Sequence, residues 1–124
     1  MIERLPLNWA RTLLSQLVEP RTERVDPRDC DEYRYLGLEQ VEPHTSRVLG
    51  YVDATTMHSS AVRFRAGDVL YGRLRPYLNK VVLASQSGIA SAEFIVLPES
   101  DLLDQRFLAL RLSARDFVHF ACTQ

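Results

Sequence analysis

Residues 67–84, GDVLYGRLRPYLNKVVLA, carry the clearest signals of local structure in the chain. Gly67 and Asp68 are typical of a tight turn, and the apolar residues that follow predict a strand over residues 69–71. Gly72 interrupts that strand, either by adopting a positive φ or by letting another backbone come close. Pro76 stiffens the chain where the strand stops, and the β-branched run after it predicts a strand over residues 80–84.

The link between these two strands is rich in hydrogen-bond donors. Arg73 and Arg75 alternate around Leu74, so an extended chain presents both guanidinium groups on one face and packs Leu74 inward. The remaining polar side chains are Tyr77, Asn79 and Lys80. This set can contact phosphates, sugars and base edges of nucleic acid. The alternative is a β-turn whose arginines pair with acidic loops.

The charge of the chain is balanced in total but not along the sequence. The 15 basic and 16 acidic residues give a net charge of -1. Residues 19–53 contain nine acids and five bases, a net of -4, whereas residues 54–92 contain five bases and one acid, a net of +4. A local positive field attracts phosphate whatever the net charge, which adds Arg63 and Arg65 to the candidate DNA contacts. The alternative is a solvated basic strand face that is compensated by acids folded against it.

Outward from this segment, the sequence predicts short strands flanked by helices. The further predicted strands cover residues 33–38, 48–52, 61–64 and 89–97. One helix is expected over residues 9–18, and one or two more after a cap at Asp101 or Asp104. Residues 20–32 are charged, contain two prolines and predict an exposed loop. We therefore expect a single α+β domain over residues 1–124, a small, mostly antiparallel twisted β-sheet with short flanking helices at both ends.

Composition excludes several classes of protein. With 124 residues, 46% hydrophobic and 25% charged, the chain has the make-up of one globular domain and not of a disordered or fibrous protein. It has no apolar run near the ~20 residues of a membrane helix, and its first residues do not form a signal peptide. Cys30 and Cys122 are far apart and outside any CxxC motif, so free thiols in a cytoplasmic protein are expected.

The sequence offers no catalytic constellation, and we expect no catalytic residue, metal or cofactor. Its histidines, His44, His58 and His119, are not at metal-ligand spacing. Asp68 and Glu93 lack the neighbouring lysine of a metal-dependent nuclease core. We expect these two acids to have a structural role, as ion-pair partners of Arg73, Arg75 or Lys80.

Residues 67–80, followed by residues 88–97 with the sequence GIASAEFIVL, resemble the target recognition domain of type I restriction-modification specificity subunits. Residues 35–39, YLGLE, are similar to a strand of that family, and Trp9 with the apolar stretch after it is similar to the family's opening. Ala90 and Ala92 depart from the pattern, since the family often has cysteine and a hydroxyl residue there.

The resemblance implies a non-catalytic domain that binds double-stranded DNA and reads one half of a bipartite target. It implies two protein partners, a methyltransferase subunit that uses S-adenosylmethionine and, through it, a translocating nuclease subunit. A full specificity subunit has two such domains, each with a long spacer helix, so we expect this chain to be a single half without that helix. The DNA contacts we expect are Arg73, Arg75, Tyr77, Asn79, Lys80, Arg63 and Arg65.

A protein-interaction module is the competing hypothesis. In that case the domain docks on a methyltransferase subunit or self-associates. Its docking surfaces would be the acidic residues 19–32 and the apolar C-terminal helix over residues 107–120.

Overall fold

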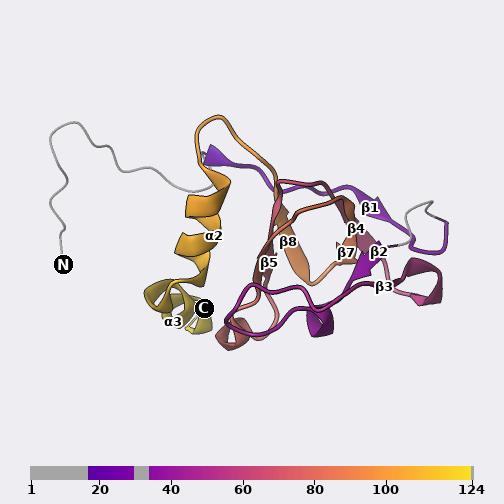
Figure 1. Cartoon of the computed structure of the whole chain (residues 1–124), viewed down its shortest axis with the longest axis horizontal. Coiled ribbons are helices and arrows are strands. Elements are labelled where there is room, and N and C mark those ends of the chain that lie inside the picture. Colours follow the sequence, from indigo (N-terminus) through magenta and orange to yellow (C-terminus); the bar gives the residue numbers. More distant parts are fainter. Residues whose placement is uncertain (1–16, 30–33, 124) are drawn as a thin grey trace, which may run out of the picture.

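Two β-sheets and two α-helices are built from residues 17–29 and 34–123, the part of the chain that the computed structural model describes (Figure 1). The five-stranded sheet has the order β1 (Arg24–Val25), β4 (Ala61–Phe64), β7 (Gly88–Ser91), β2 (Arg34–Leu36) and β3 (Val52–Asp53). The three-stranded sheet has the order β6 (Val81–Leu83), β5 (Val69–Gly72) and β8 (Phe94–Leu97). Strands β2 and β7 are parallel and the other pairs are antiparallel, so the predicted α+β class is confirmed.

The helices α2 (Gln105–Ser113) and α3 (Arg115–Cys122) lie together on one side of the sheets (Figure 1). The Asp104 carboxylate caps α2 by accepting a hydrogen bond from the Phe107 backbone N–H at 3.0 Å, which confirms the later of the two predicted starts. The helix predicted over residues 9–18 lies outside the described residues, apart from its last two positions. No helix in the described part of the chain has the length and apolarity that crossing a bilayer requires.

Three short 3-10 helices connect the strands within the described residues: η1 (Leu38–Gln40), η2 (Ala54–Thr56) and η3 (Pro76–Leu78). The first of them shortens the strand predicted over residues 33–38, which ends at Leu36 as β2. The third forms the tip of the link between β5 and β6.

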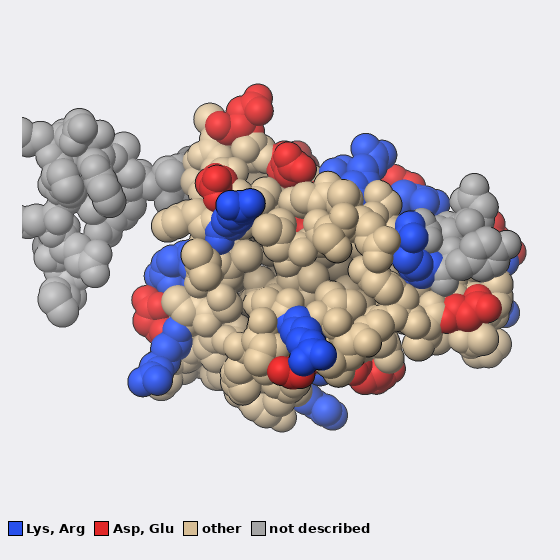
Figure 2. Space-filling view, viewed as in Figure 1, with Lys and Arg blue, Asp and Glu red and all other residues tan. Residues whose placement is uncertain are grey.

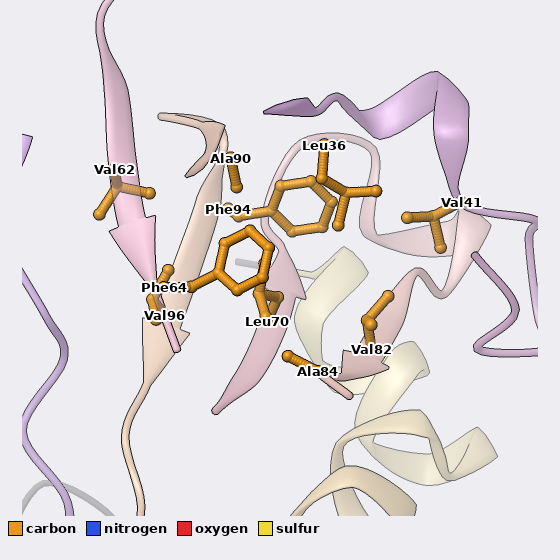
Figure 3. Close-up of a cluster of buried hydrophobic side chains, with 10 residues drawn as sticks. All are labelled: Leu36, Val41, Val62, Phe64, Leu70, Val82, Ala84, Ala90, Phe94 and Val96. Atoms are coloured by element: carbon orange, nitrogen blue, oxygen red, sulfur yellow. The ribbon is translucent and has the colours of Figure 1, made fainter. Parts of the chain in front are cut away.

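The alternation of side chains along β5 explains the layering of the molecule. Leu70 points to the space between the two sheets, whereas Val69 and Tyr71 point to the helices. Ten buried side chains fill the space between the sheets (Figure 3): Leu36, Val41, Val62, Phe64, Leu70, Val82, Ala84, Ala90, Phe94 and Val96. Each fully buried Leu, Val or Phe here stabilises the fold by about 1.5–3 kcal/mol. The three-stranded sheet is thus buried on both faces, which keeps the ends of β5 and β6 fixed.

Gly72 continues β5 rather than interrupting it, and its role is a close approach of two backbones. Its N–H donates to the Lys80 carbonyl at 2.9 Å. A Cβ atom at this position would lie 3.2 Å from that carbonyl oxygen and 2.9 Å from a methyl group of Leu38. The hydrogen bond closes the β5–β6 link at its base.

The single strand predicted over residues 89–97 is wrong, because the chain crosses there from one sheet to the other. It turns at Ala92 and Glu93, where the Ser91 hydroxyl accepts a hydrogen bond from the Glu93 backbone N–H at 3.1 Å. Strand β7 before the turn pairs with β2 and β4, whereas β8 after it pairs with β5. Both strands are apolar on both faces, so hydropathy alone does not mark the crossing.

Two further predictions need correction. Residues 20–32 do not form only a loop, because β1 pairs with β4 and the Arg21 N–H donates to the Val96 carbonyl at 2.8 Å. The strand predicted over residues 48–52 is reduced to β3 and an isolated bridge between Val48 and Val41. In both cases the sheet contact is too short to produce an alternating pattern.

Candidate nucleic-acid interface

A buried ion pair holds the turn that precedes β5. The Asp68 side chain is 1% exposed and accepts hydrogen bonds from Arg21 Nε at 2.7 Å and Arg21 Nη2 at 3.2 Å. It also accepts a hydrogen bond from the Arg65 backbone N–H at 2.9 Å. The hydrogen bond that Arg21 donates to Asp68 raises the pKa of Arg21, so the arginine stays charged. The expected structural role of Asp68 is thus observed, but the expected partners Arg73, Arg75 and Lys80 are wrong.

The segment from Arg73 to Lys80, here called the β5–β6 loop, is not extended. Arg75 has a φ of 51°, in the left-handed region, and Leu74 is 49% exposed. The prediction that Leu74 packs inward between two arginines on one face is therefore wrong. The reason is local: Pro76 begins η3, and the chain must turn sharply at Arg75 to enter it. As a result, Arg73 and Arg75 lie on different surfaces of the domain.

Arg73 lies beside the turn between β7 and β8. Its backbone N–H donates to the Glu93 carbonyl at 3.1 Å and its Nη2 donates to the Ala92 carbonyl at 3.3 Å. Its side chain is exposed and lines a groove of about 240 Å³ together with Arg21 and Arg24. No acidic residue lines this groove within the described part of the chain. We call it the arginine groove.

Arg75 lines a different hollow, a cavity of about 350 Å³ at the end of the five-stranded sheet. We call it the mixed cavity, because its lining combines cations, carboxylates and hydroxyl groups. The polar side chains that line it are Tyr35, Glu39, Ser59, Arg75, Lys80, Ser91 and Glu93. Burial raises the pKa of the Tyr35 hydroxyl, although a hydrogen bond with Ser91 opposes the effect. The nearby carboxylates raise that pKa further.

Two of the predicted DNA contacts have structural partners in this fold. The Asn79 side-chain amide donates to the Ser113 carbonyl at 3.0 Å and so ties the β5–β6 loop to the end of α2. The Lys80 ammonium donates to the Leu38 carbonyl at 2.6 Å. These contacts fix the C-terminal half of the loop and leave less of either side chain for a ligand.

The remaining predicted contacts differ in their exposure. Tyr77 is 58% exposed at the tip of η3, and Arg65 is exposed just before the Gly67 turn. Arg63 is half-buried on β4 and pairs with Glu23, with Nε 2.8 Å from the carboxylate. The structure therefore brings Arg73, Arg75 and Tyr77 together on one loop, with Arg63 committed elsewhere.

Charge is unevenly spread over the face shown in Figure 2. Basic side chains lie beside β1 and β4 and also around α2 and α3, with acidic groups among them at both ends (Figures 1 and 2). Sequence reasoning missed two arginines, Arg21 and Arg24, that line the groove with Arg73. They belong to the segment with net negative charge, and only their pairing to β8 and β4 brings them to this place.

No metal site emerges among the described residues, where no cluster of three or more His, Cys, Asp or Glu side chains has the geometry to hold an ion. Glu93 forms no ion pair with any described residue, so the expected pairing with Arg73, Arg75 or Lys80 is wrong for it as well. Its backbone carbonyl, rather than its carboxylate, holds Arg73.

Comparisons with known proteins show what this chain is similar to. The chain is 27% identical over 121 residues to the Type I restriction enzyme EcoDI specificity subunit of Escherichia coli, covering 94% of the chain. Its fold matches the crystal structure of the HsdS subunit from Thermoanaerobacter tengcongensis with a TM-score of 0.78, over 95% of the chain at 24% identity. The chain resembles type I restriction specificity subunits in both sequence and fold. The resemblance inferred from the motifs is thereby confirmed.

A second solved chain, from work on complex assembly and conformational transition of the type I R-M system, matches with a TM-score of 0.78 at 23% identity over 91% of the chain. The chain spans 26% of the curated specificity subunit and 31–32% of the two solved chains. The match therefore concerns one region of a specificity subunit. No protein-family model matches the chain.

Proposed function

We propose that this domain recognises double-stranded DNA and reads one half of a bipartite target within a type I restriction-modification system. The observation that carries the proposal is the arginine groove, where Arg24 and Arg73 are exposed and form no ion pair with any described residue. Uncompensated guanidinium groups on a rigid frame bind phosphate oxygens well. The similarity to specificity subunits supports duplex DNA as the source of those phosphates.

The same similarity supports the rest of the proposed assignment. The domain has no reaction of its own and delivers target specificity to a methyltransferase subunit and, through it, to a nuclease subunit, in the cytoplasm. The DNA contacts we propose first are Arg73, Arg75 and Tyr77, with Arg24 added from the structure. Arg65, Lys80, Asn79 and Arg63 remain predicted contacts with weaker support, since the last three already have partners within the fold.

Duplex binding tests this proposal directly. We expect the double variant Arg73→Ala and Arg75→Ala to lose at least about tenfold in affinity for a fluorescent duplex in an anisotropy titration, because two charge-assisted contacts disappear. The matched control is Arg106→Ala, which removes an exposed cation from α2. Unchanged binding by the double variant, or an equal loss in the control, would contradict the proposal.

A protein-docking role has one observation in its favour. Large apolar side chains are exposed on and beside the two C-terminal helices: Leu102, Phe107, Leu110 and Phe120. Neighbouring exposed apolar groups of this kind mark protein interfaces. If docking is the main role, the chain elutes as a dimer in size-exclusion chromatography at any salt concentration, and Phe107→Ser with Leu110→Ser restores the monomer. A salt-independent monomer that does not change on this substitution speaks against it.

A further inference from the structure

We propose that the two arginines of the β5–β6 loop have separate tasks in DNA recognition. Arg75 reads a G·C base pair at the mouth of the mixed cavity, and Arg73 binds a backbone phosphate in the arginine groove. The inference rests on the proposed function, and it assigns base reading to one named residue.

The arginine groove suits a phosphate because its charged lining is entirely cationic. It is lined by Arg21, Arg24 and Arg73, and Asp68 compensates only Arg21. A phosphate contact depends on charge and not on base sequence, so a residue here adds affinity without discrimination. The hydrogen bond from Arg73 Nη2 to the Ala92 carbonyl orients the guanidinium and leaves its other donors for a ligand.

The mixed cavity suits a base pair and not a phosphate. Carboxylates of Glu39 and Glu93 line it together with Arg75, and they would repel a phosphate group. In the major groove, guanine presents the acceptors N7 and O6, and its paired cytosine presents an N4 amino donor. A guanidinium and a carboxylate that line one cavity match this pattern, because arginine donates to guanine and a carboxylate accepts from cytosine.

The backbone at Arg75 is held in a fixed conformation. Arg75 adopts φ 51° and ψ 64°, a left-handed conformation that is costly for a residue with a side chain. The fold maintains it from both ends, since Pro76 fixes the next φ and Asn79 is bonded to Ser113. A strained residue whose backbone is fixed beside a cavity is typical of a recognition site, because little backbone ordering cost remains on binding.

The test uses the full chain and begins with the wild type. Duplexes are selected from a random pool, and affinities for the selected duplex and for a scrambled duplex are then measured over a series of KCl concentrations. We expect the wild type to prefer the selected duplex and to bind both less tightly as salt rises.

The variants of the two arginines are then distinguished by their affinity, their salt dependence and their preference for the selected duplex. Arg73→Ala lowers affinity for both duplexes by the same factor and reduces the slope of log affinity against log salt by about 1. Arg75→Lys keeps the charge and the slope but lowers the preference for the selected duplex by at least about fivefold, because lysine lacks the bidentate fork. Arg75→Asn, which tolerates the left-handed backbone, shows the same loss of preference. Thermal melting confirms that each variant is folded, and Arg106→Ala changes neither quantity.

The outcomes distinguish this inference from the proposed function. A wild type that binds no duplex overturns both. A wild type that binds duplexes without sequence preference, or Arg75→Lys and Arg75→Asn variants that keep the preference, overturns the inference and leaves DNA binding intact. A loss of preference in Arg73→Ala also overturns it, because the residue assigned to phosphate would then read sequence.

Discussion

Two arginines at the β1–β4 edge and two on the β5–β6 loop are in opposite electrostatic states. On the edge, Arg63 pairs with Glu23 at 2.8 Å and Arg28 pairs with Asp26 at 3.3 Å. On the loop, Arg73 and Arg75 form no ion pair with any described residue. The difference arises because Glu23 lies within reach of Arg63 and Asp26 within reach of Arg28, whereas no described carboxylate pairs with Arg73 or Arg75. A basic side chain thus becomes part of a binding surface where no carboxylate pairs with it, and Arg24 meets this condition although its own segment is acidic.

The largest expected effect concerns the ion pair between Arg21 and Asp68, whose carboxylate is buried, unlike those of the exposed pairs at the β1–β4 edge. Asp68→Ala leaves Arg21 without its partner and the Arg65 N–H without its acceptor. We expect a loss of about 3 kcal/mol in the free energy of unfolding, measured by urea denaturation. Arg21→Ala is the companion variant. A loss below about 1 kcal/mol in Asp68→Ala would mean that this pair resembles the exposed pairs of the β1–β4 edge.

A smaller effect is expected at the base of the loop. Gly72→Ala places a Cβ 3.2 Å from the Lys80 carbonyl oxygen and so pushes β5 and β6 apart. We expect a loss of about 1–2 kcal/mol in stability, together with weaker duplex binding because the loop arginines shift. Stability by urea denaturation and affinity by anisotropy are measured on the same sample. Full affinity in a destabilised variant would show that the loop is held from its tip.

The comparison predicts that removing Arg63, which is paired with Glu23, has little effect on DNA binding or stability. Arg63→Ala should change duplex affinity by less than about twofold and the free energy of unfolding by less than about 1 kcal/mol, since an exposed ion pair contributes little. Both quantities are compared with those of Arg73→Ala. If Arg63→Ala weakens duplex binding as much as Arg73→Ala does, the contrast between edge and loop is broken.

The smallest effect is a pH dependence that involves Tyr35, which lines the mixed cavity. Burial raises the pKa of Tyr35 and of Tyr71 in the folded state above the usual value of about 10. A raised folded pKa means that stability is complete below the unfolded pKa and is lost as pH rises through the folded one. We expect the free energy of unfolding to fall above about pH 10 and to fall less steeply in Tyr35→Phe. If the free energy of unfolding falls equally steeply with pH in the wild type and in Tyr35→Phe, Tyr35 does not contribute to this pH dependence.

Local sequence patterns predict the parts of the fold whose strands alternate or whose helices have caps. Strand β4, strand β5 and the Asp104 cap of α2 lie where the sequence indicates them. The crossing at Ala92 and Glu93 is not predictable from hydropathy, because β7 and β8 are buried on both faces and differ only in their partners. Strand β1 is not predicted for another reason, since two residues are too few to show any periodicity.

The candidate site follows the same division between local and long-range information. The sequence locates the loop that carries Arg73, Arg75 and Tyr77, because its turn and proline are local signals. It does not locate Arg24, which reaches the arginine groove only through pairing with Val62 on β4. It also does not separate the two arginines, because the groove and the cavity that they line are formed by residues distant in the sequence.

The hydrogen bond from the Gly72 N–H to the Lys80 carbonyl closes the β5–β6 link at its base, so we expect the residues between them to be exchangeable as a unit. The register of β5 with β6 is set by Val69, Leu70 and Tyr71, all of which precede the closure. Residues 73–78 can therefore be replaced by another sequence of equal length without sliding either strand, provided that the Asn79 anchor stays. If the proposed function holds, we expect that grafting such six-residue segments between related domains changes the target preference on an unchanged scaffold.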